Sequence, residues 1–327
     1  MKAILFPKYG SPDVLQLTEV EKPTPTENQV LIKVIAAAVN PLDWHGMRGE
    51  PFIARIGNGI RKPKDQRLGA DIAGRVEAVG KNVTELKPGD EVFGAIGAGG
   101  FAEYACTREK NLALKPGNIS FEEAAAAPVV GLTAIQGFRH AGGVRAGQKV
   151  LINGAAGGIG TFAVQYAKSC GAEVIGVCST RTVDLVRSIG ADHVIDYTRE
   201  DFTRTGQGYD LIYCAIGNRT AFAYKRALKP GGICVIAGFT SMFLLFEGML
   251  LGPLASRGDK KVTRMGISNA NKEDLLIIKE LLETRKVVPF VDRRYPLHET
   301  AEAIRYVETL HARGKVIINV VEPHGQS

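Results

Sequence analysis

The stretch "LINGAAGGIGTFAVQYAK", residues Leu151–Lys168, decides the fold of this chain. It has the pattern of a short apolar strand, a glycine-rich turn and a helix, which is how a nucleotide-binding βα unit begins. Such a turn usually holds three glycines in a G-x-G-x-x-G register, but here Ala155 takes the first position, ahead of Gly157 and Gly160. We expect this exchange to cost little, provided that the backbone at Ala155 has a negative φ.

The residues after this stretch alternate between short apolar strands and helices, which predicts a doubly wound parallel sheet covered on both faces. Gly171 and Gly190 follow two of the helices as C-cap residues. The alternation stops near Lys261. The expected strands are 150–153, 174–177, 193–196, 209–214 and 233–237, and the expected helices are 158–170, 182–189 and 219–228.

The first third of the chain has the pattern of β-structure instead. The segment "NQVLIKVIAAAV" (28–39) is a candidate strand pair, and "ADIAGRVEAVG" (70–80) and "LKPGDEVFG" (86–94) indicate further strands. Residues 120–142 then read as helical, with Ser120 as N-cap and Glu123 at the capping-box position. Past the alternating region we expect helices over 272–284 and 299–310 and a terminal strand over 315–321.

Composition is that of an ordinary globular protein: 327 residues, 45% of them hydrophobic, with five scattered cysteines and no C-x-x-C pair. The first residues lack the pattern of a signal peptide, so we expect a protein of the reducing cytoplasm. The net charge is +7, but the basic residues are spread along the chain. Its densest basic cluster, "RGDKKVTR" from Arg257, reads as a solvated loop, and nucleic acid is not the expected partner.

The longest apolar run is "MFLLFEGMLLGPL", residues 242–254, which is too short to cross a bilayer. It is interpreted first as a buried or interface helix. The alternatives that stay open are an apolar cover over a hydrophobic substrate pocket and a surface that touches a membrane.

The cofactor's identity is indicated by the segment "VIGVCSTRT" (174–182), which ends the strand after the glycine turn. An acidic residue at this strand end would bind the ribose of NAD, but Cys178 takes its place. Ser179, Thr180 and Arg181 offer two hydroxyls and a guanidinium to a 2′-phosphate, so we predict NADPH rather than NADH. Tyr197 is a further candidate for the same phosphate.

These features together resemble the medium-chain dehydrogenase/reductase family, in its zinc-lacking branch of quinone oxidoreductases and enone reductases. The resemblance rests on "AAAVNPLDW", "LGADIAGRVEAVG", "LKPGDEVFG", "GGFAEYA", "AAAAPVVGLTA" and "GAAGGIG", in which alanine at the first turn position is normal. It implies a GroES-like β-rich catalytic domain over 1–126 and 263–327 and a Rossmann NADPH-binding domain over 127–262. It also implies an active site in the cleft between the domains, and a homodimer.

The zinc ligands of related alcohol dehydrogenases are missing at the corresponding positions, which by the resemblance are Asn40, Ala70 and a residue near Val129. His45 with Asp43 lacks a third ligand, so we expect no metal. Without a Lewis acid, quinones and α,β-unsaturated carbonyls are the expected hydride acceptors, because their conjugated systems delocalise charge. A small hydrophobic acceptor is therefore the expected partner.

The resemblance also implies roles for single residues. Asn40 would lie near the nicotinamide, and His45 would donate a proton, although an ordinary half-exposed imidazole is an equal alternative. Thr133 would contact the cofactor, and Lys315, with Arg313, would approach the 2′-phosphate. The remaining predicted cofactor contacts lie in the glycine turn and at two later strand ends: Ala156, Gly157, Gly158, Ile159, Gly160, Ala215, Ile216, Ala237, Gly238 and Phe239.

Two other functions stay open on the sequence alone. One is a zinc-type alcohol dehydrogenase, against which the missing ligands argue. The other is a non-catalytic NADPH-binding protein that serves as a redox sensor or a structural partner.

Overall fold

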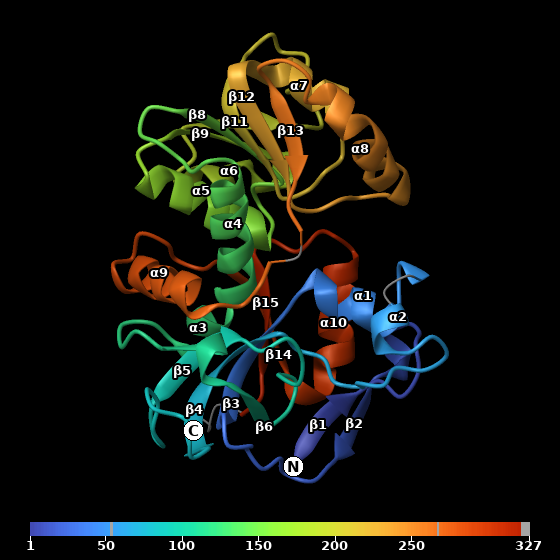
Figure 1. Ribbon diagram of the computed structural model, residues 1–327, viewed down its shortest axis with the longest axis vertical. Coiled ribbons are helices and arrows are strands. Elements are labelled where there is room, and N and C mark those ends of the chain that lie inside the picture. Colours follow the sequence, from blue (N-terminus) through green and yellow to red (C-terminus); the bar gives the residue numbers. More distant parts are fainter. Residues whose placement is uncertain (53–54, 267, 322–327) are drawn as a thin grey trace. The chain divides into compact units, whose positions relative to one another are not determined.

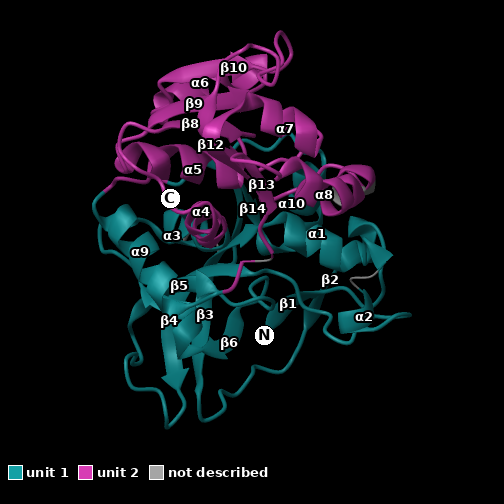
Figure 2. Ribbon diagram, turned by 45° about the horizontal axis from the view of Figure 1, so that its top comes forward, with its two compact units in different colours: residues 1–129, 270–284, 289–327 teal, residues 130–269, 285–288 magenta. Residues whose placement is uncertain are grey.

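The computed structural model describes residues 1–52, 55–266 and 268–321, and the chain forms two compact units. Unit 1 comprises residues 1–129, 270–284 and 289–327, and unit 2 comprises residues 130–269 and 285–288 (Figure 2). The glycine turn lies in unit 2, whereas both predicted catalytic residues, Asn40 and His45, lie in unit 1.

Unit 1 is built on a mainly antiparallel sheet, which has seven strands in the described part of the chain (Figure 1). The order is β14-β15-β3-β4-β5-β7, with β6 also paired to β3. Its strands are β3 (Gln29–Val39), β4 (Asp71–Val79), β5 (Glu91–Ala95), β6 (Tyr104–Arg108), β7 (Leu112–Leu114), β14 (Val291–Pro296) and β15 (Lys315–Asn319), and a separate ribbon pairs β1 (Lys2–Leu5) with β2 (Gln16–Glu19). Its helices are α1 (Pro41–Arg48), α2 (Arg55–Asn58), α3 (Phe121–Ala125), α9 (Lys272–Glu283) and α10 (Thr300–Glu308), with the 3-10 turns η1 (Pro12–Val14), η3 (Glu109–Asn111) and η5 (Leu297–Glu299).

The predicted strand pair over residues 28–39 is one continuous strand, β3. Residues Gln29–Val39 include no glycine, proline or asparagine, and their β-branched and small apolar side chains suit a central strand. Val30, Ile32 and Val34 on one face of β3 are fully buried in the unit 1 core. The strand leads directly into Asn40, and so it carries the first predicted catalytic residue to the end of the sheet.

The helical segment after residue 120 divides at Pro128, because proline cannot continue the hydrogen-bond ladder of a preceding helix. Ser120 caps α3 and forms the predicted capping box with Glu123, which is confirmed in both directions at 3.1 and 2.8 Å. The second helix, α4 (Pro128–His140), belongs mostly to unit 2.

Unit 2 is a parallel sheet with the order β10-β9-β8-β11-β12-β13, six strands among the described residues. This is the doubly wound order, in which successive strands are added first on one side of β8 and then on the other. The predicted fold class is therefore confirmed. The strands are β8 (Lys149–Asn153), β9 (Glu173–Cys178), β10 (His193–Asp196), β11 (Tyr209–Cys214), β12 (Leu228–Ile236) and β13 (Lys261–Arg264). The helices are α5 (Gly158–Ser169), α6 (Val183–Ser188), α7 (Ala221–Ala227) and α8 (Met242–Ala255), with the 3-10 turn η4 (Thr180–Thr182).

Two expectations for unit 2 are wrong in part. The basic segment from Arg257 is only partly a loop, because Lys261–Arg264 pairs with β12 as a short edge strand whose mixed side chains give little apolar signal. The run 242–254 forms the expected helix, α8, but Phe243 and Leu250 are 72% and 74% exposed, so burial within the chain is wrong for these side chains. An interface helix, a cover over a substrate pocket and a surface that touches a membrane stay predictions. Among the described residues, no helix has the length and apolar character needed to span a membrane.

Candidate functional site

The glycine turn between β8 and α5 has the conformation that the sequence requires. Gly154 takes the left-handed conformation, with φ of +85°, whereas Ala155 is not among the described non-glycine residues with positive φ. The methyl group of Ala155 is fully buried. A Cβ atom on Gly160 would lie 2.0 Å from the carbonyl oxygen of Gly154, so glycine is needed there for the helix to pack on the turn. Alanine at position 155 is therefore compatible with the turn, as expected.

The first turn of α5 is arranged to receive an anion. Gly157 is the N-cap, with extended backbone, and no acidic residue occupies the first turn. The backbone amides that open a helix have no partner within it, and they carry the positive end of the helix dipole. Ala156, Gly158 and Ile159 are only half-buried, so a ligand can approach this backbone. The turn thus has the chemistry of a pyrophosphate site.

The end of β9 holds the residues predicted to bind the 2′-phosphate. Arg181 is exposed, and its guanidinium forms no hydrogen bond or ion pair with any described residue. Ser179 is half-buried, with its hydroxyl 3.4 Å from that of Thr182. Tyr197 is 51% exposed, and its backbone amide donates to the carbonyl oxygen of Cys178.

A carboxylate that the sequence reading missed lies at this strand end. Asp196 ends β10 opposite Cys178, and its Oδ2 accepts a hydrogen bond of 2.5 Å from the hydroxyl of Thr180. That bond, with others from Thr198, lowers the pKa of the Asp196 carboxyl. The expectation that no carboxylate is present here holds for β9 alone and is wrong for the sheet edge. The signal was available, because the carboxyl ends of parallel neighbours meet at one edge.

The ends of β11 and β12 lie beside the glycine turn. The amides of Ala215 and Ile216 donate to the carbonyl of Asn153, at 3.0 and 3.3 Å. A Cβ atom on Gly154 would lie 2.9 Å from the Ile216 side chain, so this isoleucine rests against the turn. The Asn153 side chain donates to the Ile216 carbonyl at 2.7 Å, and this buried asparagine is a positioning residue that sequence reading missed.

The next strand end continues the same edge. Ala237 donates its amide to the carbonyl of Cys214, and Gly217 donates its amide to the carbonyl of Gly238 at 2.8 Å. Gly217 also forms a parallel bridge with Phe239. The structure therefore gathers the predicted residues of the glycine turn and of the two strand ends along one edge of unit 2.

Thr133 is placed differently, on α4. It is nearly buried, its hydroxyl lies 3.1 Å from that of Ser268, and its carbonyl accepts from the hydroxyl of Tyr213. Its role as a cofactor contact stays a prediction.

In unit 1, a buried polar network surrounds Asn40. Its Nδ2 donates to Asp71 at 2.9 Å and to the carbonyl of Ala38 at 3.2 Å, and its Oδ1 accepts from the Lys315 ammonium at 2.6 Å. Lys315 also donates to the Val39 carbonyl and to Asp71. Burial raises the pKa of the Asp71 carboxyl, and the lysine charge partly offsets that rise.

This network corrects the prediction for Lys315. Its side chain is 4% exposed, and all three ammonium protons have acceptors within unit 1, so it is not placed to reach a cofactor phosphate. Arg313 is instead paired with Asp292. Asn40 is also buried with both amide protons engaged, which makes it a residue that orders the start of α1.

Asp43 completes the N-terminus of α1. Its carboxylate accepts from the amide of Asn40 at 2.7 Å, which closes a capping box, and from the amide of Gly69 at 2.9 Å. Burial is the main cause that raises the pKa of Asp43 to about 6, and the two amide bonds oppose it. The carboxylate thereby holds the loop that precedes Ala70 against the helix.

His45 lies two residues further along α1. Its Nδ1 is 2.9 Å from the carbonyl oxygen of Glu50, and because a carbonyl only accepts, Nδ1 carries the proton. Nε2 is therefore the nitrogen that can exchange a proton with a ligand. The ring stacks on Trp44 with centroids 3.6 Å apart, and the Trp44 indole nitrogen is buried without a partner among the described residues. Burial lowers the pKa of His45 below its ordinary value.

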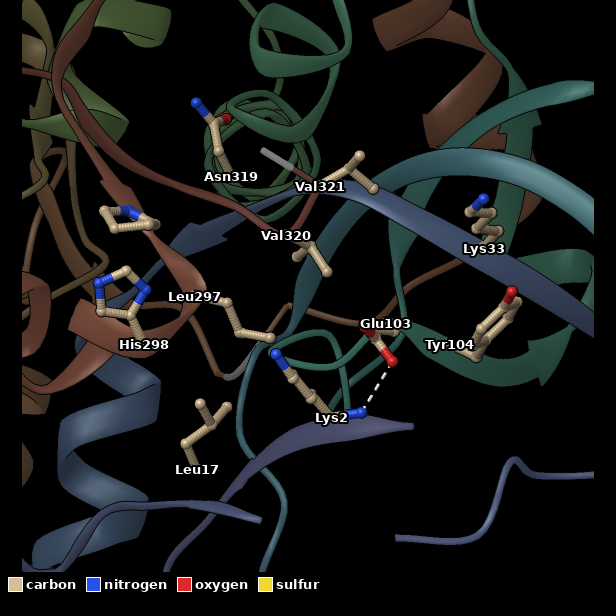
Figure 3. A pocket seen from close by; sticks show the side chains of 11 residues that line it. Lys2, Leu17, Lys33, Glu103, Tyr104, Leu297, His298, Asn319, Val320 and Val321 are labelled. Atoms are coloured by element: carbon tan, nitrogen blue, oxygen red, sulfur yellow. Dashed lines mark hydrogen bonds between the residues drawn. The ribbon is translucent and has the colours of Figure 1, made fainter. Parts of the chain in front are cut away.

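Two further observations concern metal ligands and pockets among the described residues. No group of three or more metal-ligating side chains occurs among the residues that the structure describes. Unit 1 also holds a pocket with a volume of about 530 Å³, lined among others by Lys33, Tyr104 and Leu297. Figure 3 shows this lining, in which the backbone amide of Lys2 donates a hydrogen bond to the Glu103 carboxylate. None of the predicted site residues lines this pocket.

Comparisons with known proteins agree with this geometry. Residues 26–117 match the family model of the alcohol dehydrogenase GroES-like domain, and residues 189–318 match that of the zinc-binding dehydrogenases. The chain is 36% identical to 2-methylene-furan-3-one reductase of Solanum lycopersicum, over 98% of this chain and 79% of the relative. It is 35% identical to the chloroplastic NADPH-dependent alkenal/one oxidoreductase of Arabidopsis thaliana, over 97% and 79%. Among solved structures, it resembles the quinone oxidoreductase from Coxiella burnetii with a TM-score of 0.87 and 31% identity, over 98% and 99% of the two chains.

Proposed function

Because this chain belongs to the medium-chain dehydrogenase/reductase family, among its quinone and enone oxidoreductases, we propose that it is an NADPH-dependent reductase. Its acceptor is an α,β-unsaturated carbonyl or a quinone. The observation that carries the proposal is the edge of unit 2, where the first turn of α5 and the ends of β11 and β12 meet. The tomato and Arabidopsis relatives, a furanone reductase and an NADPH-dependent alkenal/one oxidoreductase by name, support the choice of chemistry.

The residues of unit 2 fit NADPH. The backbone amides of Gly158, Ile159 and Gly160, in the first turn of α5, would bind the pyrophosphate, so that this part of the ligand contacts backbone rather than side chains. Arg181 and Ser179 bind the 2′-phosphate from the end of β9, while Thr180 is held by Asp196. When bound, NADPH supplies the hydride.

The residues of unit 1 serve the acceptor. His45 exchanges a proton through Nε2, and as the imidazolium it protonates the reduced acceptor. Asn40 and Asp43 fix the first turn of α1 and hence the position of His45. We propose that the reaction needs no zinc, since Asn40 and Ala70 stand at the positions that resemble zinc ligands, and neither an amide engaged in the network nor a methyl group binds zinc well.

We propose unit 1 as the catalytic domain and unit 2 as the NADPH-binding domain, assembled in a homodimer of the cytoplasm. The dimer rests on the family resemblance. The compartment rests on the five cysteines, which are all free.

The test is NADPH oxidation by the purified chain with a panel of alkenals, vinyl ketones and quinones, with each product identified by mass spectrometry. We expect saturable turnover to a saturated carbonyl or a hydroquinone, unaffected by a zinc chelator. Saturable NADPH binding without turnover of any acceptor would instead indicate a binding protein. Activity that is lost with the chelator and restored by zinc would indicate an alcohol dehydrogenase.

A further inference from the structure

Helix α8 exposes several large apolar side chains to solvent. Phe243, Phe246, Met249, Leu250 and Leu254 are between 40% and 74% exposed. Within the helix, Glu247 is the sole charged residue. A contiguous apolar surface of this kind marks a binding site in soluble proteins.

The other side of α8 is anchored to unit 2, so the exposed side is held in place. The Glu247 carboxylate accepts from the amide of Ala221 at the start of α7, at 3.2 and 3.3 Å from its two oxygens. Ser241 caps the helix by accepting from the amide of Leu244. Ala255 at the far end is fully buried. Helix α8 packs beside α7 and β13 (Figure 1).

The exposed surface is continuous with the edge where the nicotinamide end of the cofactor is proposed to lie. The amide of Thr240, the residue before the N-cap, donates to the carbonyl of Gly217 at 3.2 Å. The guanidinium of Arg264 lies 5.9 Å from the ring centroid of Phe239 and donates to the carbonyl of Leu244 at 3.5 Å. Phe239 is itself 39% exposed, on the loop that leads from the end of β12 into α8. We call Phe239 and the exposed apolar side chains of α8 together the apolar track; Arg264 contacts both of its parts.

The length of this track indicates the size of its ligand. From Phe243 to Leu254 an α-helix rises roughly 16 Å, which accommodates an extended alkyl chain of about a dozen carbons. Phe243, Phe246, Leu250 and Leu254 are spaced by three or four residues and therefore follow one side of the helix.

We propose that the exposed side of α8 binds the apolar tail of the acceptor, so that the preferred substrates are enones, enals or quinones with a long alkyl or prenyl chain. This inference rests on the proposed function and names its substrate class. The track's origin at the β11 and β12 ends favours an acceptor tail over a second copy of the chain or a membrane surface, since neither of those would require continuity with the cofactor edge.

The experiment measures kcat/KM for a series of straight-chain vinyl ketones, from methyl to decyl, with the full chain and saturating NADPH. For the unaltered protein we expect about a twofold rise per added methylene, because one side of the tail stays in water and only part of the transfer energy is gained. Leu250→Gln should lower the decyl-to-methyl ratio about tenfold or more, and Leu250→Met should restore it. Leu276→Gln, at an exposed position on α9, is the matched control and should leave the ratio unchanged.

If the decyl-to-methyl ratio of kcat/KM is the same in the unaltered protein and in Leu250→Gln, the inference is overturned. Turnover of the methyl ketone in that case still supports the proposed function. If no acceptor is turned over, the proposed function fails, and calorimetric binding of a saturated decyl ketone to the NADPH complex decides the inference separately. Binding that weakens at least tenfold in Leu250→Gln supports it, and equal binding overturns it. A dimer that becomes monomeric in Leu250→Gln, or anionic vesicle binding lost in that variant, also overturns it.

Discussion

The ammonium nitrogen of Lys315 lies 2.6 Å from the amide oxygen of Asn40, and both side chains are buried. Because lysine only donates and the Asp71 carboxylate only accepts, the direction of the Asn40 amide between them is fixed. A reversed amide would place NH₂ against the ammonium and oxygen against the carboxylate. The terminal strand β15 thus determines the geometry at the start of α1, the helix that carries His45.

Lys315→Met should destabilise the protein by about 3 kcal/mol, because it leaves the buried carboxylate of Asp71 without its cation. Equilibrium unfolding in urea measures this. Lys22→Met is the control, since Lys22 pairs with Glu77 at the surface and its loss should destabilise the protein far less. Equal losses in the two variants would contradict the role given to the network. Combining Lys315→Met with Asp71→Asn should recover part of the loss, because the uncompensated charge is then removed as well.

Asp43 should make the protein less stable as the pH rises from about 4 to about 6. Its folded-state pKa is raised from 3.8 to about 6, so in this range the folded state binds more protons than the unfolded state, and the free energy of unfolding falls with pH. The full effect is of the order of 3 kcal/mol. It is measured as the difference in unfolding free energy between the unaltered protein and Asp43→Asn at several pH values. Taking this difference cancels the pH dependence that the other carboxyl groups contribute to both proteins. A difference that does not change with pH would show that Asp43 is not titrating there.

The features that sequence reading predicted well depend on residues close together in the chain. The glycine turn, its strand and its helix occupy one stretch, so Gly154, Ala155 and Gly160 constrain each other locally. The capping box of Ser120 and Glu123 spans a single helical turn in the same way. Local sterics and local hydrogen bonds decide such features, and both can be read from spacing.

The features that it missed depend on contacts between distant segments or on solvent exposure. Lys315 is 275 positions from Asn40, and nothing in either segment alone shows that they pair. Asp196 reaches Thr180 from the neighbouring strand. The composition of α8 indicated burial, because apolar residues are usually buried, but burial is decided by what packs against a helix.

Arg181→Ala should raise the KM for NADPH about tenfold or more and leave the KM for NADH nearly unchanged, because only NADPH carries the 2′-phosphate that the guanidinium binds. Steady-state kinetics with both cofactors measure this. Arg187→Ala removes another exposed arginine, on α6, and should change neither constant. Equal effects of Arg181→Ala on both cofactors would rule out the phosphate contact.

Asp196→Asn should have the opposite effect and lower the KM for NADPH. The Asp196 carboxylate lies beside the proposed phosphate site and holds the Thr180 hydroxyl at 2.5 Å. Its neutralisation removes a repulsion and lets that hydroxyl turn to the phosphate. The change is measured as the ratio of the KM for NADPH to the KM for NADH, which should fall. A rise in the KM for NADH would instead show that Asp196 binds the ribose of NADH.

His45→Phe should lower kcat for a vinyl ketone about a hundredfold, the usual range for loss of a general acid. The imidazolium is the form that gives a proton from Nε2, since Nδ1 is bonded to the Glu50 carbonyl. Burial lowers the pKa of His45 below 6.5, so kcat of the unaltered protein should fall as the pH rises through that lowered value and stay low above it. The pH profile of His45→Phe should be flat over the same range, whereas His298→Phe, which alters an exposed histidine of unit 1, should keep the original profile. An unchanged rate and profile in His45→Phe would mean that the imidazole only packs on Trp44, and that the proton reaches the acceptor from another group.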